Sequence, residues 1–312
     1  QTSVVFHVPA GVITAGAAMP PFYAKAAEIL TQQGVKTCFV PHQRATTLAQ
    51  IEADRDFHII DRGRIRHPRA LNTASAYIAP FFYLDPMGVR TFSSLAELPF
   101  EADRVDPHRA QRFHNNLRAR LVTARKSRYE QPSEVLAIPQ HCIAVFLQAE
   151  GERDVDEACY FNLRQMIRAL LARADPRPIV VKPHPMDSDL ETLAWLVQKA
   201  RKDSRLQIIP ANIHDILAQA DVVVTINSAV GIEAMLHARP VVLCGHADFR
   251  ACAETARSPD GLDAAISQAE AKDWPFAAFL HWFFVENCLS LRAKDFGPQL
   301  IARITATGFS LP

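Results

Sequence analysis

Short apolar runs rich in β-branched residues recur along this chain, and amphipathic stretches of helical period separate them. Such runs are typical of strands that are buried on both faces of a parallel sheet. In the N-terminal third, strands are expected at residues 3–8, 35–40 and 57–60, with helices at residues 22–33 and 46–53. This alternation of strands and helices predicts a Rossmann-like domain.

The same alternation returns in the second half of the chain and predicts a second Rossmann-like domain. Its expected strands cover residues 142–147, 179–181, 206–209, 222–226 and 241–243. Its expected helices cover residues 157–173, 190–200, 213–219, 232–238 and 264–271. The fold class is therefore expected to be α/β.

The stretch between these two patterns is polar and basic. A long helix is expected over residues 107–128, and the proline-containing segment 129–134 is expected to link the domains. We therefore place the domains at residues 1–130 and 131–275, followed by C-terminal helices at residues 276–312.

Composition narrows the class of protein. The chain has 312 residues, enough for two domains of ordinary size, and 49% of them are hydrophobic. A net charge of +1 argues against a general nucleic-acid binder. Six scattered cysteines without a C-x-x-C pair indicate reduced thiols. No apolar run is long enough to span a bilayer and no signal peptide is evident, so we expect a cytoplasmic protein.

The most informative stretch is ADVVVTINSAVGIEAMLHARPVVLCG, which predicts a strand, a loop, a helix and a second strand. Asn227 and Ser228 follow the strand, at the edge where open α/β sheets bind ligands. The amides near Ala229 at the helix start would bind an anion. Gly231 permits close backbone approach, and Glu233 can accept hydrogen bonds from a ribose. The alternative is an ordinary βαβ unit with a Ser/Asn cap.

A second motif, Lys182-Pro183-His184-Pro185, follows the strand at residues 179–181. The prolines fix the backbone on both sides of His184. Lys182 suits a phosphate as a point charge, and His184 suits it as a donor or acid. The alternative is a proline-stiffened turn with a surface histidine. Neighbouring parallel strands would bring both motifs to one crevice.

Together the two motifs resemble those of the capsule polysaccharide biosynthesis family, which includes the Kdo (3-deoxy-manno-octulosonic acid) transferases of bacterial capsule assembly. The matching positions are Lys182 to Pro185, Ser228, Gly231, Glu233, Ala234, Met235, Pro240 to Val242 and Gly245. Met235 replaces the family's usual leucine, and residues 246–250 depart from its Phe-Tyr and Gly-rich segment. The specific resemblance covers residues 140–290.

The resemblance implies two facing Rossmann-like domains, the GT-B architecture, with the helices of residues 276–312 crossing back to the first domain. It implies a CMP-activated acid sugar, CMP-Kdo, as donor in the second domain, with no separate cofactor. Donor-binding residues would be Lys182, Pro185, Asn227, Ser228, Ala229, Gly231 and Glu233. With His184, the Lys182 and Ser228 side chains would stabilise the charge that develops on the departing CMP. Asp187-Ser-Asp189 is interpreted as a helix cap, so no metal is expected.

Two carboxylates are candidates for acting on the sugar or on the acceptor hydroxyl. Asp85 follows an aromatic run and precedes Pro86, and a similar aromatic-Leu-Asp-Pro segment occurs in the family. The alternative for Asp85 is a turn that caps local backbone amides. Glu150, on the loop after the strand at residues 142–147, is the second candidate nucleophile or base.

Basic stretches raise the question of partners. Arg62, Arg64, Arg66 and Arg69 are interpreted as a solvated rim, with an anionic acceptor sugar as the alternative. The helix at residues 107–128 is likewise interpreted as solvated, with attraction to anionic lipid-linked saccharide at the inner membrane face as the alternative.

Several functions remain open at this point. The expected partners are a nucleotide-sugar donor, a saccharide or glycolipid acceptor and capsule-assembly proteins, but not nucleic acid. The alternatives to a Kdo-type transferase are a transferase for another nucleotide sugar (a CMP-sialic acid or a UDP- or GDP-hexose), a nucleotide-sugar epimerase or hydrolase, and a noncatalytic assembly factor.

Overall fold

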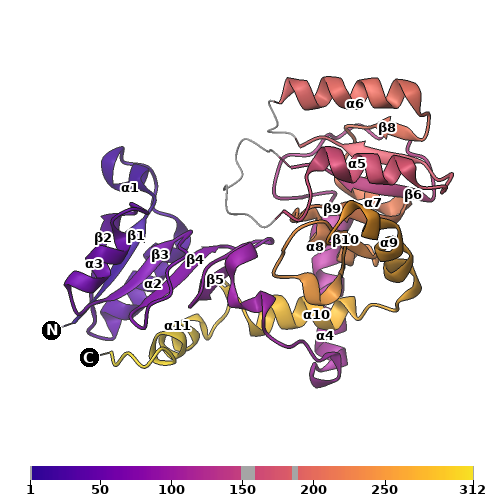
Figure 1. The fold of residues 1–312 in the computed structure, drawn as a ribbon. Helices are drawn as coiled ribbons and strands as arrows, with labels where there is room; N and C mark the ends of the chain where they lie inside the picture. Colours follow the sequence, from indigo (N-terminus) through magenta and orange to yellow (C-terminus); the bar gives the residue numbers. More distant parts are fainter. Residues whose placement is uncertain (1, 149–158, 185–188, 312) are drawn as a thin grey trace. The chain divides into compact units, whose positions relative to one another are not determined.

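The computed structural model describes residues 2–148, 159–184 and 189–311, which form two compact units (Figure 1). Unit 1 comprises Gln1–Leu98 together with Phe283–Pro312, and unit 2 comprises Pro99–Trp282. Each unit contains one six-stranded sheet. The prediction of an α/β protein with two parallel-rich sheets is confirmed.

The sheet of unit 1 has the strand order β12-β5-β4-β3-β1-β2. Its strands are β1 (Ser3–Val8), β2 (Lys36–Pro41), β3 (Phe57–Asp61), β4 (Ala70–Ser75), β5 (Phe81–Asp85) and β12 (Leu289–Ser290). Its helices are α1 (Ala10–Thr14), α2 (Pro21–Gln32), α3 (Thr47–Ala53) and α11 (Phe296–Thr305). Strands β1 to β4 pair in parallel, and β5 and β12 add antiparallel partners at one edge.

Helix α2 shows how the apolar pattern builds the core of unit 1. Pro21 occupies its first turn, where a missing amide hydrogen costs nothing, and Gly34 follows its end at a left-handed φ of 79°. Phe22, Ala26 and Leu30 lie one turn apart and are fully buried. They pack in one cluster with residues of β1, β3 and α11.

The sheet of unit 2 is entirely parallel, in the order β11-β10-β9-β6-β7-β8. Its strands are β6 (Cys142–Phe146), β7 (Ile179–Lys182), β8 (Leu206–Ile208), β9 (Ala220–Thr225), β10 (Val241–Leu243) and β11 (Glu254–Thr255). Its helices are α4 (Pro107–Leu117), α5 (Leu163–Ala172), α6 (Leu190–Lys202), α7 (Ile213–Gln219), α8 (Val230–Leu236), α9 (Leu262–Ala271) and α10 (Phe276–His281). The central strands are buried throughout, as expected for a sheet covered on both faces.

The division between the two compact units falls after Leu98 and after Trp282. Helix α4 packs against α10, and the side chains of His114 and Arg118 bond to the carbonyls of Met235 and Leu236 at the end of α8. The basic stretch therefore belongs to unit 2. It is α-helical only to Leu117 and continues as a π-helical turn over Arg118–Thr123.

Candidate functional site

A small cavity of about 60 Å³ lies in unit 2 where β6, β7 and β9 end. Its lining residues are Ser127, Arg128, Tyr129, Gln131, Phe146, Leu147, Lys182, Pro183, His184, Ile213, Ser228, Ala229, Val230 and Glu233. Both motifs singled out in the sequence thus contribute to one cavity, at the edge where parallel sheets bind ligands. We call this cavity the β6–β7–β9 pocket.

Lys182 supplies buried positive charge to the pocket. It is the last residue of β7, opposite Phe146 of β6 in register, and only 8% of its surface is exposed. Its ammonium group donates a hydrogen bond to the carbonyl of Ala211. Burial lowers the pKa of Lys182. A bound anion would compensate that burial, because it favours the charged form of the amine.

His184 lies next to Tyr129, a residue that neither sequence motif includes. Its ring meets the Tyr129 ring edge-on, with 5.1 Å between centroids and 82° between planes. The two residues line the pocket together with Ser127 and Arg128. An aromatic wall next to a cationic group is a common feature of ligand sites.

The segment that carries Tyr129 was expected to be a linker between domains, but it is anchored inside unit 2. Arg125 forms a bidentate ion pair with Asp215, with an Nε to Oδ1 distance of 3.0 Å. A hydrogen bond of 2.8 Å joins His214 Nε2 to the Lys126 carbonyl, and the Gln131 side chain accepts from the Ile213 amide at 3.1 Å. These contacts with α7 hold residues 125–131 against the pocket.

Asn227 is held by a reciprocal amide pair. Gln148 donates to Asn227 Oδ1 at 2.9 Å and accepts from the Asn227 amide at 3.1 Å. Asn227 Nδ2 donates to the His246 carbonyl at 3.1 Å. The side chain thus ties the ends of β6 and β9 and the loop after β10 together, which fixes the loop that begins at Ser228.

The start of α8, which was expected to bind an anion, offers few groups that could do so. Helix α8 has seven residues, and its N-cap residue Ala229 makes no side-chain cap. The Ser228 hydroxyl accepts from the Val230 amide at 3.3 Å. Ser228 and Ala229 still line the pocket, but a helix this short has little macrodipole, so the positive charge of the pocket comes from the side chains of Lys182 and Arg128.

Glu233 places a carboxyl group inside the pocket. The residue is 8% exposed, and burial raises its pKa to about 7, although a hydrogen bond with Ser127 acts in the opposite direction. A carboxyl group with this pKa exists in both protonation states near neutrality, so it can donate as well as accept a hydrogen bond.

Asp85 lies in unit 1, at the end of β5, and is 3% exposed. Its Oδ1 accepts from the amides of Met87 and Gly88, at 2.7 and 3.1 Å. Its Oδ2 accepts from the amide and the hydroxyl of Ser94, at 2.9 and 2.6 Å. The carboxylate thus has the contacts of the turn interpretation. The other sequence candidates, Glu150 and Pro185, lie outside the described residues.

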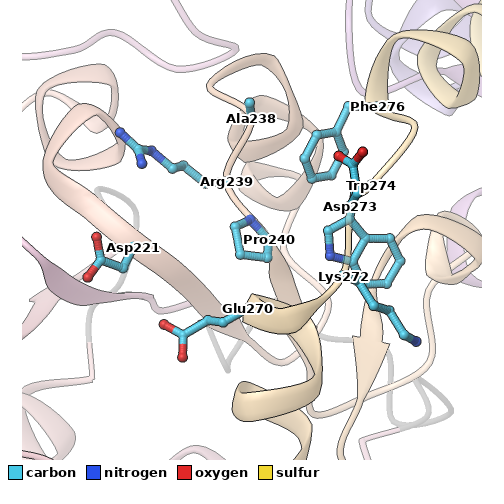
Figure 2. A pocket seen from close by; sticks show the side chains of 9 residues that line it. All are labelled: Asp221, Ala238, Arg239, Pro240, Glu270, Lys272, Asp273, Trp274 and Phe276. Carbon is cyan, nitrogen blue, oxygen red and sulfur yellow. The ribbon is translucent and has the colours of Figure 1, made fainter.

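A second cavity of unit 2, of about 410 Å³, lies at the opposite edge of the sheet, next to the start of β9 and of β10. Figure 2 shows the carboxylates of Asp221 and Glu270 on one side of Pro240 and the rings of Trp274 and Phe276 on the other. Arg177 pairs with both of these carboxylates. These charges already compensate one another, which favours the β6–β7–β9 pocket as the ligand site.

Among the residues that the structure covers, no group of three or more His, Cys, Asp or Glu side chains is arranged to hold a metal ion. The described helices include none that is both long and apolar enough to cross a membrane.

A comparison of the sequence with models of known protein families shows which family the chain belongs to. Residues 108–269, just over half of the chain, match the model of the capsule polysaccharide biosynthesis protein family. The chain belongs to this family. The matched range includes both motifs of the β6–β7–β9 pocket and the segment that carries Tyr129. No curated protein matches this family member in sequence.

Solved structures resemble this capsule-family protein in fold. KpsC, a β-Kdo 2,7-transferase of Thermosulfurimonas dismutans, superposes with a TM-score of 0.57 at 14% identity, over 99% of this chain and all of that one. The KpsC β-Kdo 2,4-transferase of the same organism gives a TM-score of 0.49 at 13% identity, over 89% of each chain. Anabaena HepE in complex with UDP gives 0.42 at 10% identity, over 98% of this chain and all of that one. The likeness to the β-Kdo 2,7-transferase, at a TM-score above 0.5, shows that the fold is GT-B-like.

Proposed function

We propose that this protein is a glycosyltransferase of capsule or surface polysaccharide biosynthesis, which binds the nucleotide of its sugar donor in the β6–β7–β9 pocket. The observation that carries the proposal is the convergence of Lys182, His184, Ser228 and Glu233 on one pocket at the carboxyl ends of parallel strands. Cationic, hydroxyl and carboxyl groups are those needed to bind a phosphate and a sugar hydroxyl.

The donor is proposed to be CMP-Kdo or a related CMP-activated acid sugar, on the basis of membership in the capsule family. When the glycosidic bond breaks, its electron pair leaves with the CMP phosphate. Lys182 and His184 would stabilise that growing charge, the type of interaction that contributes most to catalysis. Glu233 would hold a ribose hydroxyl. Asp85 and Glu150 stay sequence-based predictions for the carboxylate that acts on the sugar or the acceptor hydroxyl.

The acceptor is proposed to be a saccharide, free or carried on a lipid. A lipid-carried acceptor would bring the enzyme to the inner face of the cytoplasmic membrane, although none of the helices described for this chain can span it. Transfer to such an acceptor moves the sugar from the phosphate oxygen to an acceptor oxygen, and the acceptor proton passes to the catalytic carboxylate or to water.

The first test is a thermal-shift panel with CMP, UDP, GDP and ADP, because a ligand that binds only the native state raises the unfolding temperature. We expect a saturable shift with CMP that is lost in His184→Ala and Lys182→Met. The matched control is His108→Ala, an exposed histidine of unit 2 on α4, which should keep the full shift.

The panel separates the alternatives. A shift with UDP or GDP but not CMP would overturn the CMP donor and keep a nucleotide-sugar transferase. No shift with any nucleotide would contradict the pocket assignment. Release of CMP from CMP-Kdo without acceptor, at the rate seen with acceptor, would indicate a hydrolase instead of a transferase.

A further inference from the structure

Helix α6 exposes apolar side chains on its outward face. Leu190 is 77% exposed and Val197 is 42% exposed, and Ala194 between them is also exposed. Spacings of four and three residues put these side chains on one face of the helix. The buried face of α6, with Thr192 and Leu196, is a different one. Figure 1 shows α6 at the outer edge of unit 2, next to β8.

Such exposure of apolar side chains is unusual for a helix at the surface. A helix that covers a soluble domain normally turns charged or polar side chains outward along its whole length. In α6 the exposed side chains of Leu190, Ala194 and Val197 are apolar; Glu191, beside them in the first turn, pairs with Arg164, and the last turn carries Lys199, Arg201 and Lys202. The apolar stripe from Leu190 to Val197 is about 10 Å long.

Next to this stripe, three cationic side chains surround the indole ring of Trp195. Trp195 is half-buried, and the charged groups of Arg164, Arg168 and Lys199 each lie 5.6 Å from its ring centroid. Arg164 also pairs with Glu191 at 2.7 Å. Arg168 comes from α5, so two helices contribute to one basic and aromatic surface.

Most of these cations lack a carboxylate partner. Within the described ranges, no Asp or Glu lies at ion-pair distance from Arg168, Lys199, Arg201 or Lys202, whereas several other arginines of unit 2 are paired. Uncompensated positive charge beside exposed apolar groups calls for an anionic partner with an apolar interior. We call this set the α5–α6 surface: Arg164, Arg168, Leu190, Ala194, Trp195, Val197, Lys199, Arg201 and Lys202.

We propose that the α5–α6 surface docks this protein on an anionic phospholipid bilayer. Leu190 and Val197 would enter the boundary between headgroups and acyl chains, Trp195 would lie at headgroup level, and the cations would contact lipid phosphates. A nucleic-acid backbone offers no apolar layer for Leu190 and Val197. The apolar stripe from Leu190 to Val197 is also too small to form the core of a stable protein interface, which buries about 800 Å² on each partner.

The inference differs from the expectation for the basic stretch at residues 107–128. The outward residues of α4 are polar, and its buried residues, Ala110, His114 and Leu117, face into unit 2. Helix α4 therefore has cations but no exposed apolar group to insert. The α5–α6 surface is also distinct from the residues that line the β6–β7–β9 pocket, so the docking proposal does not depend on the identity of the donor.

The test is co-sedimentation of the full chain with vesicles of phosphatidylcholine alone and of phosphatidylcholine with phosphatidylglycerol. Binding is expected only to the anionic vesicles and should weaken as salt is added. Arg201→Gln/Lys202→Gln should weaken it about 25-fold, since each cation near such a surface contributes about fivefold. The matched control Arg109→Gln/Arg112→Gln removes the same charge from α4 and should leave binding unchanged.

A second readout tests insertion. Trp195 emission is expected to shift to shorter wavelength on anionic vesicles, and Trp195→Phe should remove that shift. Leu190→Ser/Val197→Ser should abolish the shift and weaken sedimentation while the unfolding temperature stays the same. These surface variants should also keep the nucleotide-induced thermal shift, which separates a failure of docking from a failure of the proposed function.

Three results would overturn the proposal. The first is no binding to either kind of vesicle. The second is equal loss of binding in the α4 control, which would assign the effect to net charge alone. The third is binding to double-stranded DNA that depends on Arg201 and Lys202 without any vesicle binding, which would assign the surface to nucleic acid.

Discussion

The backbone of Gly231 lies directly against the ring of Phe249. A Cβ added at Gly231 would stand 2.7 Å from Phe249 Cε2 and 3.0 Å from Cζ. Phe249 is fully buried, so its ring has little freedom to move away. The glycine of the motif therefore allows α8 to approach the loop after β10, and this packing accounts for the residue without a ligand.

We expect Gly231→Ala to destabilise the protein by about 1–3 kcal/mol, because the added methyl overpacks the contact with Phe249. Phe249→Leu should relieve part of this, so the double variant should lose less stability than the sum of the single variants. Urea unfolding measures both effects. A stable Gly231→Ala that no longer binds nucleotide would assign the glycine to the ligand instead.

Glu233 should make nucleotide binding depend on pH. Its pKa of about 7 means that the carboxyl becomes negative as pH rises through neutrality, in the same pocket that is proposed to hold the phosphate. Nucleotide affinity should fall above pH 7 in wild type and stay flat in Glu233→Gln. Titrations at several pH values measure this, and an equal decline in both proteins would contradict the role.

The raised pKa of Glu233 also makes the stability of the folded protein depend on pH. The folded pKa is raised from 4.5, so the folded state binds more protons than the unfolded state between pH 4.5 and 7. The contribution of Glu233 to stability is then present below pH 4.5 and is lost as pH rises through 7. Glu233→Gln should therefore gain stability relative to wild type above pH 7.

A buried histidine network in unit 1 should make the protein acid-sensitive. A hydrogen bond of 2.9 Å joins His7 Nε2 to His58 Nδ1, and a second of 3.0 Å joins His58 Nε2 to Asp54. Burial, with the neighbouring His58 and His42, lowers the pKa of His7 from 6.5 to about 4. The unfolded state therefore binds more protons in this interval.

Stability contributed by His7 should be full above pH 6.5 and lost as pH falls towards 4, by up to about 3 kcal/mol. His7→Gln should flatten the stability profile across that interval, whatever its effect at neutral pH. The exposed control His108→Ala should keep the wild-type slope. Identical slopes in all three proteins would refute the assignment.

Asp85→Asn tests two interpretations of one carboxylate. Loss of the negative charge at the Met87, Gly88 and Ser94 donors should destabilise unit 1 by about 1–3 kcal/mol. Turnover per folded molecule decides the catalytic prediction: unchanged turnover would remove Asp85 from the reaction, and a large loss would support it. Ser94→Ala, which removes one donor but no charge, is the matched control for the turn.

The sequence predicted the apolar strands of the parallel pairs, but it missed the polar strand β4 and also the aromatic strand β5. Strands such as β1, β6 and β9 are visible because a short run of β-branched apolar residues strongly favours a buried strand. Strand β4 was missed because Asn72 and Thr73 are polar, yet both are fully buried. Asn72 Nδ2 donates to the carbonyls of Ile65 and Asp85, and Thr73 Oγ1 to that of Tyr83. Such compensation depends on partners that composition cannot reveal.

For a similar reason, the sequence predicted the two motifs of the candidate site but not the rest of its lining. The Lys182–His184 and Asn227–Ser228 motifs follow strands, so the rule for parallel sheets placed both at one edge. In the structure they flank β6, which lies between β7 and β9. Tyr129 and Gln131 belong to an irregular segment without periodicity, and only its contacts with α7 place it at the pocket.

Strand β12 has a consequence for how the protein folds as it is made. Residues 283–312 complete unit 1: Leu289 pairs with Phe82, and Phe296, Leu300 and Ile304 fill the same core as β1. During synthesis residues 1–98 leave the ribosome before unit 2, but the segment that completes their sheet leaves after unit 2. At about 5–20 residues per second, unit 2 emerges whole in the interval and can fold first. Until β12 arrives, the β5 edge of the nascent N-terminal sheet is unpaired, which exposes it to chaperones and to misassembly.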